Sequence, residues 1–277
     1  MSEMALPWLM RRSGMSPRAL TRRPDPISAP LPVVVAAPAP PAPSFGPTDP
    51  LTIVASATPF FFLSGDLGIT IATGVSNWAD QSGNGKDASQ GTGGNQPARN
   101  VAALNGHDTV QGDGSNDVLV FTTLDLPAPG TTNIFLWGVG RQRTWTMNDS
   151  LYGGNSTTTT RLRQGGAGTP NVGANNGVTG PDNNGATVDV FVRLEHLFSN
   201  TIGDYIKLGS TLVTGTNTGN TNPAANVFSL FAHSTIAGGA GNIELACFAA
   251  WQGAPTAGEL LLLDAWVTGY YGGTVGV

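Results

Sequence analysis

Two stretches of this chain alternate apolar and polar residues with a period of two, and this pattern constrains the fold most. In residues 188–198 one face carries Val188, Val190, Val192, Leu194, His196 and Phe198. In residues 243–251 one face carries Ile243, Leu245, Cys247, Ala249 and Trp251. Successive side chains of a β-strand point to opposite sides, so both runs predict strands with an inner and an outer side.

Short apolar runs interrupted by glycine extend through the rest of the chain. They predict strands at Leu51–Ala55, Phe60–Leu63, Thr109–Gln111, Val118–Phe121, Asn133–Arg141, Thr159–Arg163, Val188–Phe198, Asp204–Leu208, Thr211–Thr214, Val227–Phe231 and Ile243–Trp251. The pair Gly209-Ser210 lies between two of these runs and predicts a hairpin turn.

One helix is predicted near the end of the chain. Thr256 and Glu259 have the spacing of a capping box, an apolar stretch follows to Val267, and Gly269 is expected to end the helix. Many short strands with a single late helix predict an all-β fold, a two-sheet antiparallel jelly-roll sandwich.

The composition agrees with a turn-rich β-protein. Charged residues make up 11% of the 277 residues, against about 25% in an average soluble domain, and glycine occurs 38 times. Cys247 is the only cysteine, which excludes a disulfide framework and a cysteine-based metal site, and we expect it in the core. We expect neither a signal peptide nor a membrane-spanning segment.

Residues 1–50 differ from residues 51–277, and we treat them as an extended, proline-rich and basic N-terminal arm that precedes the sandwich. They hold twelve of the twenty prolines and a net charge of +2, whereas the rest carries −7. The acidic body excludes nucleic acid as its main partner. The arm is either a linker or an assembly anchor, and the anchor residues would be Leu6, Trp8, Leu9, Met10, Arg11, Arg12, Arg22 and Arg23.

The most specific string in the chain is Trp78-Ala-Asp80-Gln-Ser-Gly83-Asn-Gly85, followed downstream by Asp113-Gly-Ser-Asn-Asp117. These motifs resemble the concanavalin A-like, laminin G-like jelly-roll domains that occur in phage virion and bacterial surface proteins. The resemblance covers about residues 51–277 and implies the fold. It leaves the function open, because the same fold serves lectins, glycanases and structural proteins.

Two interpretations of these motifs remain open. In the first, Gly83 and Gly85 permit a tight turn whose amides are capped by Asp80 and Ser82, while Trp78 packs in the core. In the second, oxygen ligands at the sandwich rim bind calcium, which relatives of this fold often hold. The calcium ligands would be Asp80, Asp113, Asn116 and Asp117. No other cofactor is expected.

Catalytic signatures are missing from the sequence. Glycanases of this fold place paired carboxylates on one strand, but none of the four glutamates (Glu3, Glu195, Glu244 and Glu259) has an acidic neighbour at that spacing. The three histidines lie in no recognisable catalytic context. We therefore expect no enzyme activity, and we expect Glu244 to pair with a residue on a neighbouring strand.

Aromatic side chains offer a way to bind sugars, since rings stack on the apolar faces of pyranoses. Trp145 is the best candidate because it follows Arg141 and Arg143 and precedes a polar loop. Tyr152 is the second aromatic candidate. Trp137 and Trp251 are expected in the core.

Taken together, these features predict a non-enzymatic structural protein of a phage or phage-like particle: a capsid decoration, spike, or fibre or tail component. The arm would bind other virion proteins, and the sandwich would project outward in many copies and contact host glycans. The expected location is the virion. The alternative is a carbohydrate-binding module or adhesin in which the arm is a flexible linker.

Overall fold

The computed structural model describes residues 49–121, 126, 132–146, 148–154, 161–164, 171–175, 179–183, 187–199, 202–215, 228–232 and 239–277. The N-terminal arm and its expected anchor residues lie outside the described residues, apart from Asp49 and Pro50. Asp49 caps the first helix of the sandwich domain and Pro50 begins it, so both residues belong to the sandwich domain.

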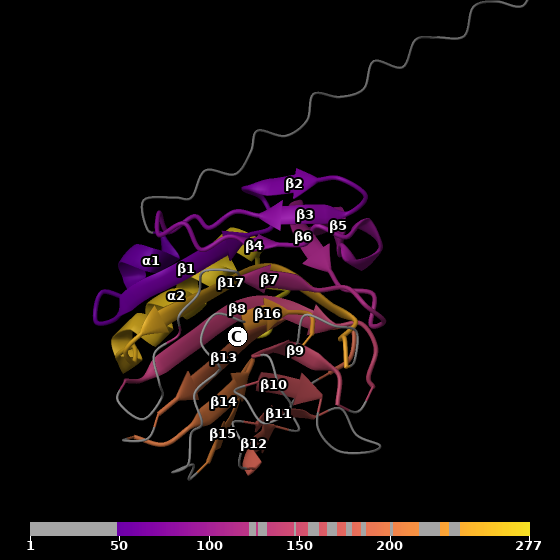
Figure 1. The fold of residues 1–277 in the computed structure, drawn as a ribbon. Helices are drawn as coiled ribbons and strands as arrows, with labels where there is room; N and C mark the ends of the chain where they lie inside the picture. Colours follow the sequence, from indigo (N-terminus) through magenta and orange to yellow (C-terminus); the bar gives the residue numbers. More distant parts are fainter. Residues whose placement is uncertain are drawn as a thin grey trace, which may run out of the picture. The chain divides into compact units, whose positions relative to one another are not determined.

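Two antiparallel sheets form the body of the protein and lie face to face (Figure 1). The eight-stranded sheet has the order β15 (Thr211–Thr214), β14 (Tyr205–Leu208), β13 (Val192–Phe198), β8 (Ile134–Gln142), β17 (Ile243–Gln252), β6 (His107–Gln111) and β5 (Ala98–Leu104), with β1 (Thr58–Ser64) also paired to β17. The nine-stranded sheet has the order β12 (Thr179–Asn183), β11 (Val172–Asn175), β10 (Arg161–Gln164), β9 (Ser150–Gly153), β16 (Phe228–Leu230), β7 (Leu119–Phe121), β4 (Ala88–Ser89), β3 (Val75–Trp78) and β2 (Ile69–Ile71). This architecture confirms the predicted all-β, two-sheet jelly-roll sandwich.

The central strands β8 and β17 of the eight-stranded sheet are buried on both faces, which explains why they are so apolar. Its inner face packs on the other sheet through residues such as Phe61, Leu136 and Phe248. Its outer face is covered by helix α2 (Ala257–Tyr271), whose Trp266 packs against Trp137 of β8. Trp137, Trp251 and Cys247 are fully buried, so all three are core residues as expected.

The structure differs from two sequence predictions, one on the type of the first element and one on the end of the last helix. The expected strand at Leu51–Ala55 is instead the start of the short helix α1 (Pro50–Ile53), because the Asp49 carboxylate accepts the Leu51 N–H and proline occupies the first turn. Helix α2 does not end at Gly269 but continues to Tyr271, where Gly272 with φ 80° terminates it. The predicted capping box of Thr256 and Glu259 is confirmed.

The alternating run at 188–198 forms a strand only from Val192 onward, because Asp189 has a left-handed backbone conformation with φ 65°. Within β13 the predicted faces are confirmed. Leu194 and Phe198 join the core between the sheets, whereas Leu197 packs beneath α2. The expected hairpin at Gly209 joins β14 to β15.

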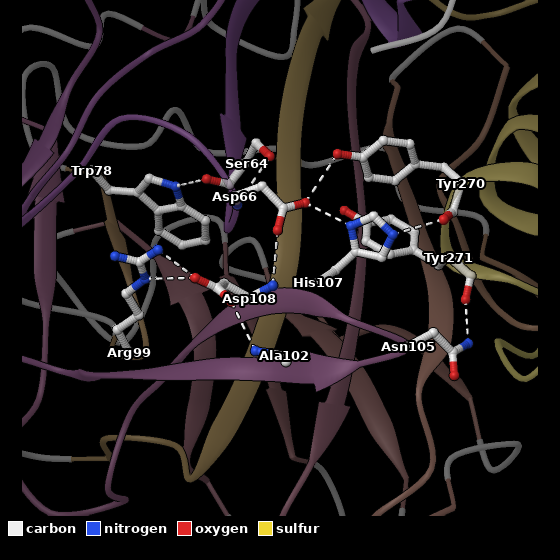
Figure 2. Close-up of polar contacts among 10 residues, drawn as sticks. All are labelled: Ser64, Asp66, Trp78, Arg99, Ala102, Asn105, His107, Asp108, Tyr270 and Tyr271. Atoms are coloured by element: carbon white, nitrogen blue, oxygen red, sulfur yellow. Dashed lines mark hydrogen bonds and ion pairs between the residues drawn. The ribbon is translucent and has the colours of Figure 1, made fainter. Parts of the chain in front are cut away.

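The C-terminal turn of α2 is fastened to the eight-stranded sheet by a buried polar network, which Figure 2 shows. Asp66 lies at its centre and accepts hydrogen bonds from the Asp108 N–H at 2.9 Å and the Tyr270 hydroxyl at 3.0 Å. The His107 ring contacts both Asp66 and the Tyr270 backbone. This network holds helix and sheet together.

Candidate ligand-binding cavity

The face of β8 that points to the other sheet carries no side chain at Gly138 and Gly140, which leaves a gap between the sheets. Gly138 is opposite Phe248 and Gly140 is opposite Leu245 on β17, so both glycines face the space between the sheets. A Cβ atom on Gly138 would lie 2.7 Å from the Cys247 carbonyl oxygen, and one on Gly140 would lie 2.7 Å from the Glu244 carbonyl oxygen. A side chain there would collide with neighbouring atoms of β17, so glycine occupies both positions, and the two glycines line a depression between the sheets.

Apolar side chains surround this depression and make it an inter-sheet cavity of about 30 Å³. Its walls are formed by β13 and β14 on one side and by β17 on the other, and β9 of the opposite sheet closes it. The side chains of these strands that line the cavity are Val192, Leu194, Leu208, Ile243, Leu245, Phe248, Leu151 and Tyr152. The cavity therefore suits an apolar group.

The cavity opens to the protein surface at the end of β8, and polar groups line this opening. Gln142, Thr187 and Val190 line this end, and Val190 is 42% exposed. Gln142 lies on the inner face, since it is opposite Ile243. Its side chain is buried, and its Oε1 atom has no hydrogen-bond partner. A buried acceptor without a partner costs free energy, and such an atom in a native structure requires a reason.

A cluster of four charged residues, which we call the rim cluster, lies on the outer side of the same strand ends: Arg141, Arg143, Asp189 and Glu244. The fully buried Glu244 carboxylate receives the Arg141 guanidinium at 2.8 Å, the Thr109 hydroxyl at 2.5 Å and the Asn100 amide at 3.1 Å. The sequence-based expectation that Glu244 pairs across strands is confirmed, because it is opposite Arg141 in the sheet.

Asp189 connects the rim cluster to the mouth of the cavity. Its carboxylate contacts Arg143 at 2.7 Å and Arg141 at 3.2 Å, and its N–H donates to the Gln142 carbonyl at 2.6 Å. A non-glycine residue with positive φ persists only where its surroundings hold it, and such residues gather at functional sites. The strained Asp189 thus fixes the segment from Thr187 to Val190 against the end of β8.

The four residues expected to bind glycan are found in three different environments. Arg141 and Tyr152 both line the cavity, and Arg143 belongs to the rim cluster. Trp145 lies partly exposed between β8 and β9, where Gln164 accepts the N–H of Thr146 and donates to the carbonyl of Thr144. Gln164 therefore fixes the backbone on both sides of the Trp145 ring.

The expectation that Tyr152 is an exposed aromatic platform is wrong. Its side chain is 1% exposed, and its hydroxyl forms a 2.6 Å hydrogen bond with His196 Nδ1 in the core. Burial raises the pKa of the tyrosine hydroxyl and lowers the pKa of His196 to about 3. Tyr152 therefore serves the site only as an inner wall of the cavity.

Sequence reasoning missed Gln142, Thr187, Asp189 and the two glycines. The glycines carried a usable signal, because Gly138 and Gly140 occupy alternate positions of a long apolar strand and so must share one face. Gln142 carried none, since a glutamine at a strand end is ordinarily a surface residue.

Asp80 caps the backbone amides of a tight turn, as the first of the two interpretations predicted. Its two carboxylate oxygens accept four hydrogen bonds, from Phe62 N, Ser82 N, Ser82 Oγ and Lys86 N, and Trp78 is fully buried. A carboxylate offers about four acceptor positions, and these hydrogen bonds occupy them. The hydrogen bonds favour the first interpretation of Asp80, and calcium binding there stays a prediction.

The other three expected calcium ligands lie in the turn before β7. Asp113 Oδ1 accepts the N–H groups of Ser115 and Asn116, and Asp117 Oδ2 accepts the Asp113 N–H at 2.9 Å. Burial and the neighbouring Asp113 raise the pKa of Asp117 to about 6. Among the described residues no three His, Cys, Asp or Glu side chains form a group suited to a metal. Calcium at this turn stays a prediction.

Every glutamate that the structure describes is engaged by neighbouring groups. Glu244 is paired with Arg141, Glu195 lies 2.9 Å from the Arg193 guanidinium, and Glu259 caps α2. Hydrogen bonds from Ser56 and Thr256 lower the pKa of Glu259 to about 2. Outside the glutamates, burial raises the pKa of Asp149 to about 6.

No family model and no curated protein sequence matches this chain. Solved structures do match in fold. Domain 4 of a GH43 extracellular arabinanase from Geobacillus stearothermophilus, in complex with arabinotriose, aligns with a TM-score of 0.50 at 16% identity, covering 75% of this chain and 98% of that one. A GH54 α-L-arabinofuranosidase aligns with a TM-score of 0.52 at 16% identity over 71% of this chain and 51% of its own.

A sialidase from Trypanosoma rangeli, in complex with sialic acid, aligns with a TM-score of 0.54 at 10% identity, covering 79% of this chain and 34% of that one. The chain thus spans about half of the arabinofuranosidase and one third of the sialidase. These likenesses show the fold, an all-β sandwich that recurs in carbohydrate-active proteins. Within the part of the chain that the structure describes, no helix is long and apolar enough to cross a membrane.

Proposed function

We propose that the sandwich binds glycans without cleaving them, through the inter-sheet cavity and the polar groups at its mouth. The observation that carries this proposal is the unpartnered Oε1 atom of Gln142 in a cavity that is otherwise apolar and reaches the surface at Val190. Binding pockets commonly combine apolar walls with a few fixed polar groups. The partly exposed Trp145 on the neighbouring loop adds an aromatic ring for stacking.

The arrangement of acidic groups supports binding rather than hydrolysis. Glycoside hydrolysis uses two carboxyl groups about 5–10 Å apart, one as acid and one as base or nucleophile. Glu244 is fully buried and is neutralised by Arg141, so it lacks access to a sugar ring. The Asp189 carboxylate beside the mouth is paired with both Arg141 and Arg143.

The solved structures with this fold support the same class of ligand. An arabinanase domain of similar size was observed with arabinotriose, and the ligand-binding domain of a botulinum neurotoxin was observed with N-acetylneuraminic acid, with a TM-score of 0.51 at 9% identity to this chain over 77% of its length and 52% of the toxin chain. Because these identities are low, the particular sugar has to be tested on this chain.

A glycan array probed with the full-length protein tests the proposal. We expect binding that Val190→Trp abolishes by blocking the mouth of the cavity, and that Trp145→Ala weakens. Val101→Trp is the matched control, because Val101 is 75% exposed on β5 and does not line the cavity. Absence of binding to every glycan, or binding that Val190→Trp leaves intact, would overturn the proposal. Release of reducing sugar from bound glycans would overturn its non-catalytic part.

We further propose that this sandwich belongs to a structural protein of a phage or phage-like particle, with the N-terminal arm bound to other virion proteins. The support is the motif resemblance around Trp78 and the proline-rich, basic composition of the arm. Many copies on one particle would raise the avidity of weak glycan contacts.

Sedimentation from the native source tests the particle proposal. We expect the full-length chain to travel with a large particle and a chain that lacks residues 1–48 to remain free. Alanine substitution of Trp8, Arg11 and Arg12 should give the same loss. The truncation keeps Asp49, because its carboxylate caps α1. Full-length chain that sediments as a small species would contradict the particle role but leave glycan binding standing.

A further inference from the structure

We propose that the inter-sheet cavity binds the acetamido group of an N-acetylated sugar, with the amide N–H donated to Gln142 Oε1 and the methyl group between the apolar walls. This inference rests on the proposed glycan-binding function and names the substituent that the cavity selects. Two observations support it: the Gln142 Oε1 atom has no hydrogen-bond donor, and apolar side chains form the inner walls of the cavity.

The cavity lacks a donor for its buried acceptor. The Gln142 side chain is 7% exposed, and its Oε1 atom has no partner. Beyond the mouth, where Arg141 and Thr187 also line the cavity, its inner walls are the aliphatic and aromatic side chains of β9, β13, β14 and β17. A buried water makes two to four hydrogen bonds and would find few partners against these walls. A ligand with one N–H and an adjacent apolar group matches both Gln142 and the walls.

The cavity also selects its ligand by size and polarity. At about 30 Å³, about the share of one water molecule in the liquid, it has room for a methyl group and not for a pyranose ring. Leu151, Leu194 and Phe248 lie along its walls, so a purely polar group would lose its hydration without compensation. A sugar hydroxyl can donate to Gln142, but it brings no apolar group to fill the remaining space.

An acetamido group meets both requirements at once. Its N–H is a single donor, and its methyl group is adjacent to the amide and fully apolar. Its carbonyl oxygen would stay at the mouth, beside the exposed Thr187 and within reach of water. The sugar ring itself would then lie outside the cavity, on the surface formed by Thr187 and Val190.

Calorimetry with the full-length protein and two matched disaccharides tests the inference. N,N′-diacetylchitobiose and cellobiose differ only in the substituents at the 2-positions. We expect the acetylated sugar to bind at least about tenfold more tightly, the lower end of what one apolar group in a pocket provides. Gln142→Leu should remove most of this preference, and Val190→Trp should abolish binding of the acetylated sugar. Val101→Trp should change neither, and circular dichroism of each variant checks that it is folded.

The outcomes separate the two proposals. Equal affinity for the two disaccharides, or a preference that Gln142→Leu leaves unchanged, overturns the acetamido assignment. If neither disaccharide binds but another glycan binds in a manner blocked by Val190→Trp, the acetamido assignment is wrong and the glycan-binding function stands. If no glycan binds at all, both proposals fail.

Discussion

The Nδ1 atom of His107 lies 2.8 Å from Asp66 Oδ2, and the Nε2 atom of the same ring lies 2.8 Å from the Tyr270 backbone oxygen (Figure 2). Both partner atoms are acceptors, so the ring donates at both contacts only when both nitrogens carry protons. His107 thereby joins β6 to the last turn of α2 and contacts the buried Asp66.

We expect His107→Ala to lower the free energy of unfolding by about 2–4 kcal/mol, because it removes the ring contacts to Asp66 and to the Tyr270 backbone and leaves buried polar atoms without a partner. Equilibrium denaturation in urea measures the loss. Amide hydrogen exchange should also accelerate in the last turn of α2, near Tyr270 and Tyr271, more than at its capped first turn. Uniform acceleration along the helix would show that His107 does not fasten this end in particular.

A second prediction concerns the buried His196. Its folded pKa is about 3 because burial disfavours the charged ring, whereas an unfolded histidine titrates near 6.5. Below pH 6.5 the unfolded chain therefore binds a proton that the folded chain does not. Stability should fall from pH 6.5 downward by up to about 1.4 kcal/mol per pH unit.

The measurement is unfolding free energy between pH 5 and 7.5 for the wild type and for His196→Gln. Glutamine can still accept the Tyr152 hydroxyl but does not titrate. The difference between the two curves isolates His196 from His107 and His233. Parallel curves would mean that His196 is not held neutral in the folded protein.

The fold was predictable because its determinants are local. The faces of β13 follow from a period of two, and the capping box of Thr256 and Glu259 fixes the start of α2. The single face predicted for residues 243–251 is wrong, because a bulge between Leu245 and Cys247 interrupts the alternation of β17. Ile243 and Leu245 face the other sheet, whereas Cys247, Ala249 and Trp251 pack beneath α2. The first strand was mispredicted because the apolar composition of Leu51–Ala55 competes with the Asp49-Pro50 helix start, which wins.

The site was only partly predictable, because it depends on contacts between distant strands. Arg141 and Tyr152 were selected for their chemistry, and both line the cavity. The role expected for Tyr152 was wrong because burial of a ring depends on the opposite sheet, which no local pattern reports. Gln142 became visible only when the register with Ile243 placed it on the inner face.

Gln142 also gives a stability prediction. If its Oε1 atom is an unpartnered buried acceptor, Gln142→Leu removes that penalty and adds apolar contacts, so we expect the protein to gain about 1 kcal/mol. The same variant should weaken ligand binding. Thermal unfolding without ligand provides the test, and a loss of stability would show that Gln142 has a structural partner.

The last prediction concerns the rim cluster, where the buried Glu244 carboxylate lies 2.8 Å from Arg141 and 3.8 Å from Arg143. Arg141→Met should cost about 3 kcal/mol, since Glu244 would remain fully buried with only the more distant Arg143 as a countercharge. Glu244→Gln should cost less, because its oxygen can still accept from Thr109 and Asn100. The double variant should recover part of the loss of Arg141→Met, since no buried charge is then unpaired. Urea denaturation of the four proteins gives the coupling free energy.

Asp189→Asn is the matched control for this cycle. It removes the charge of the exposed partner and keeps a residue type that tolerates positive φ, so we expect a change within about 1 kcal/mol. Strict additivity of Arg141→Met and Glu244→Gln would contradict the pairing of these two residues. A loss at Asp189→Asn as large as that of Arg141→Met would instead assign the stabilising role to the strained segment beside Gln142, since the Asp189 N–H binds the Gln142 carbonyl.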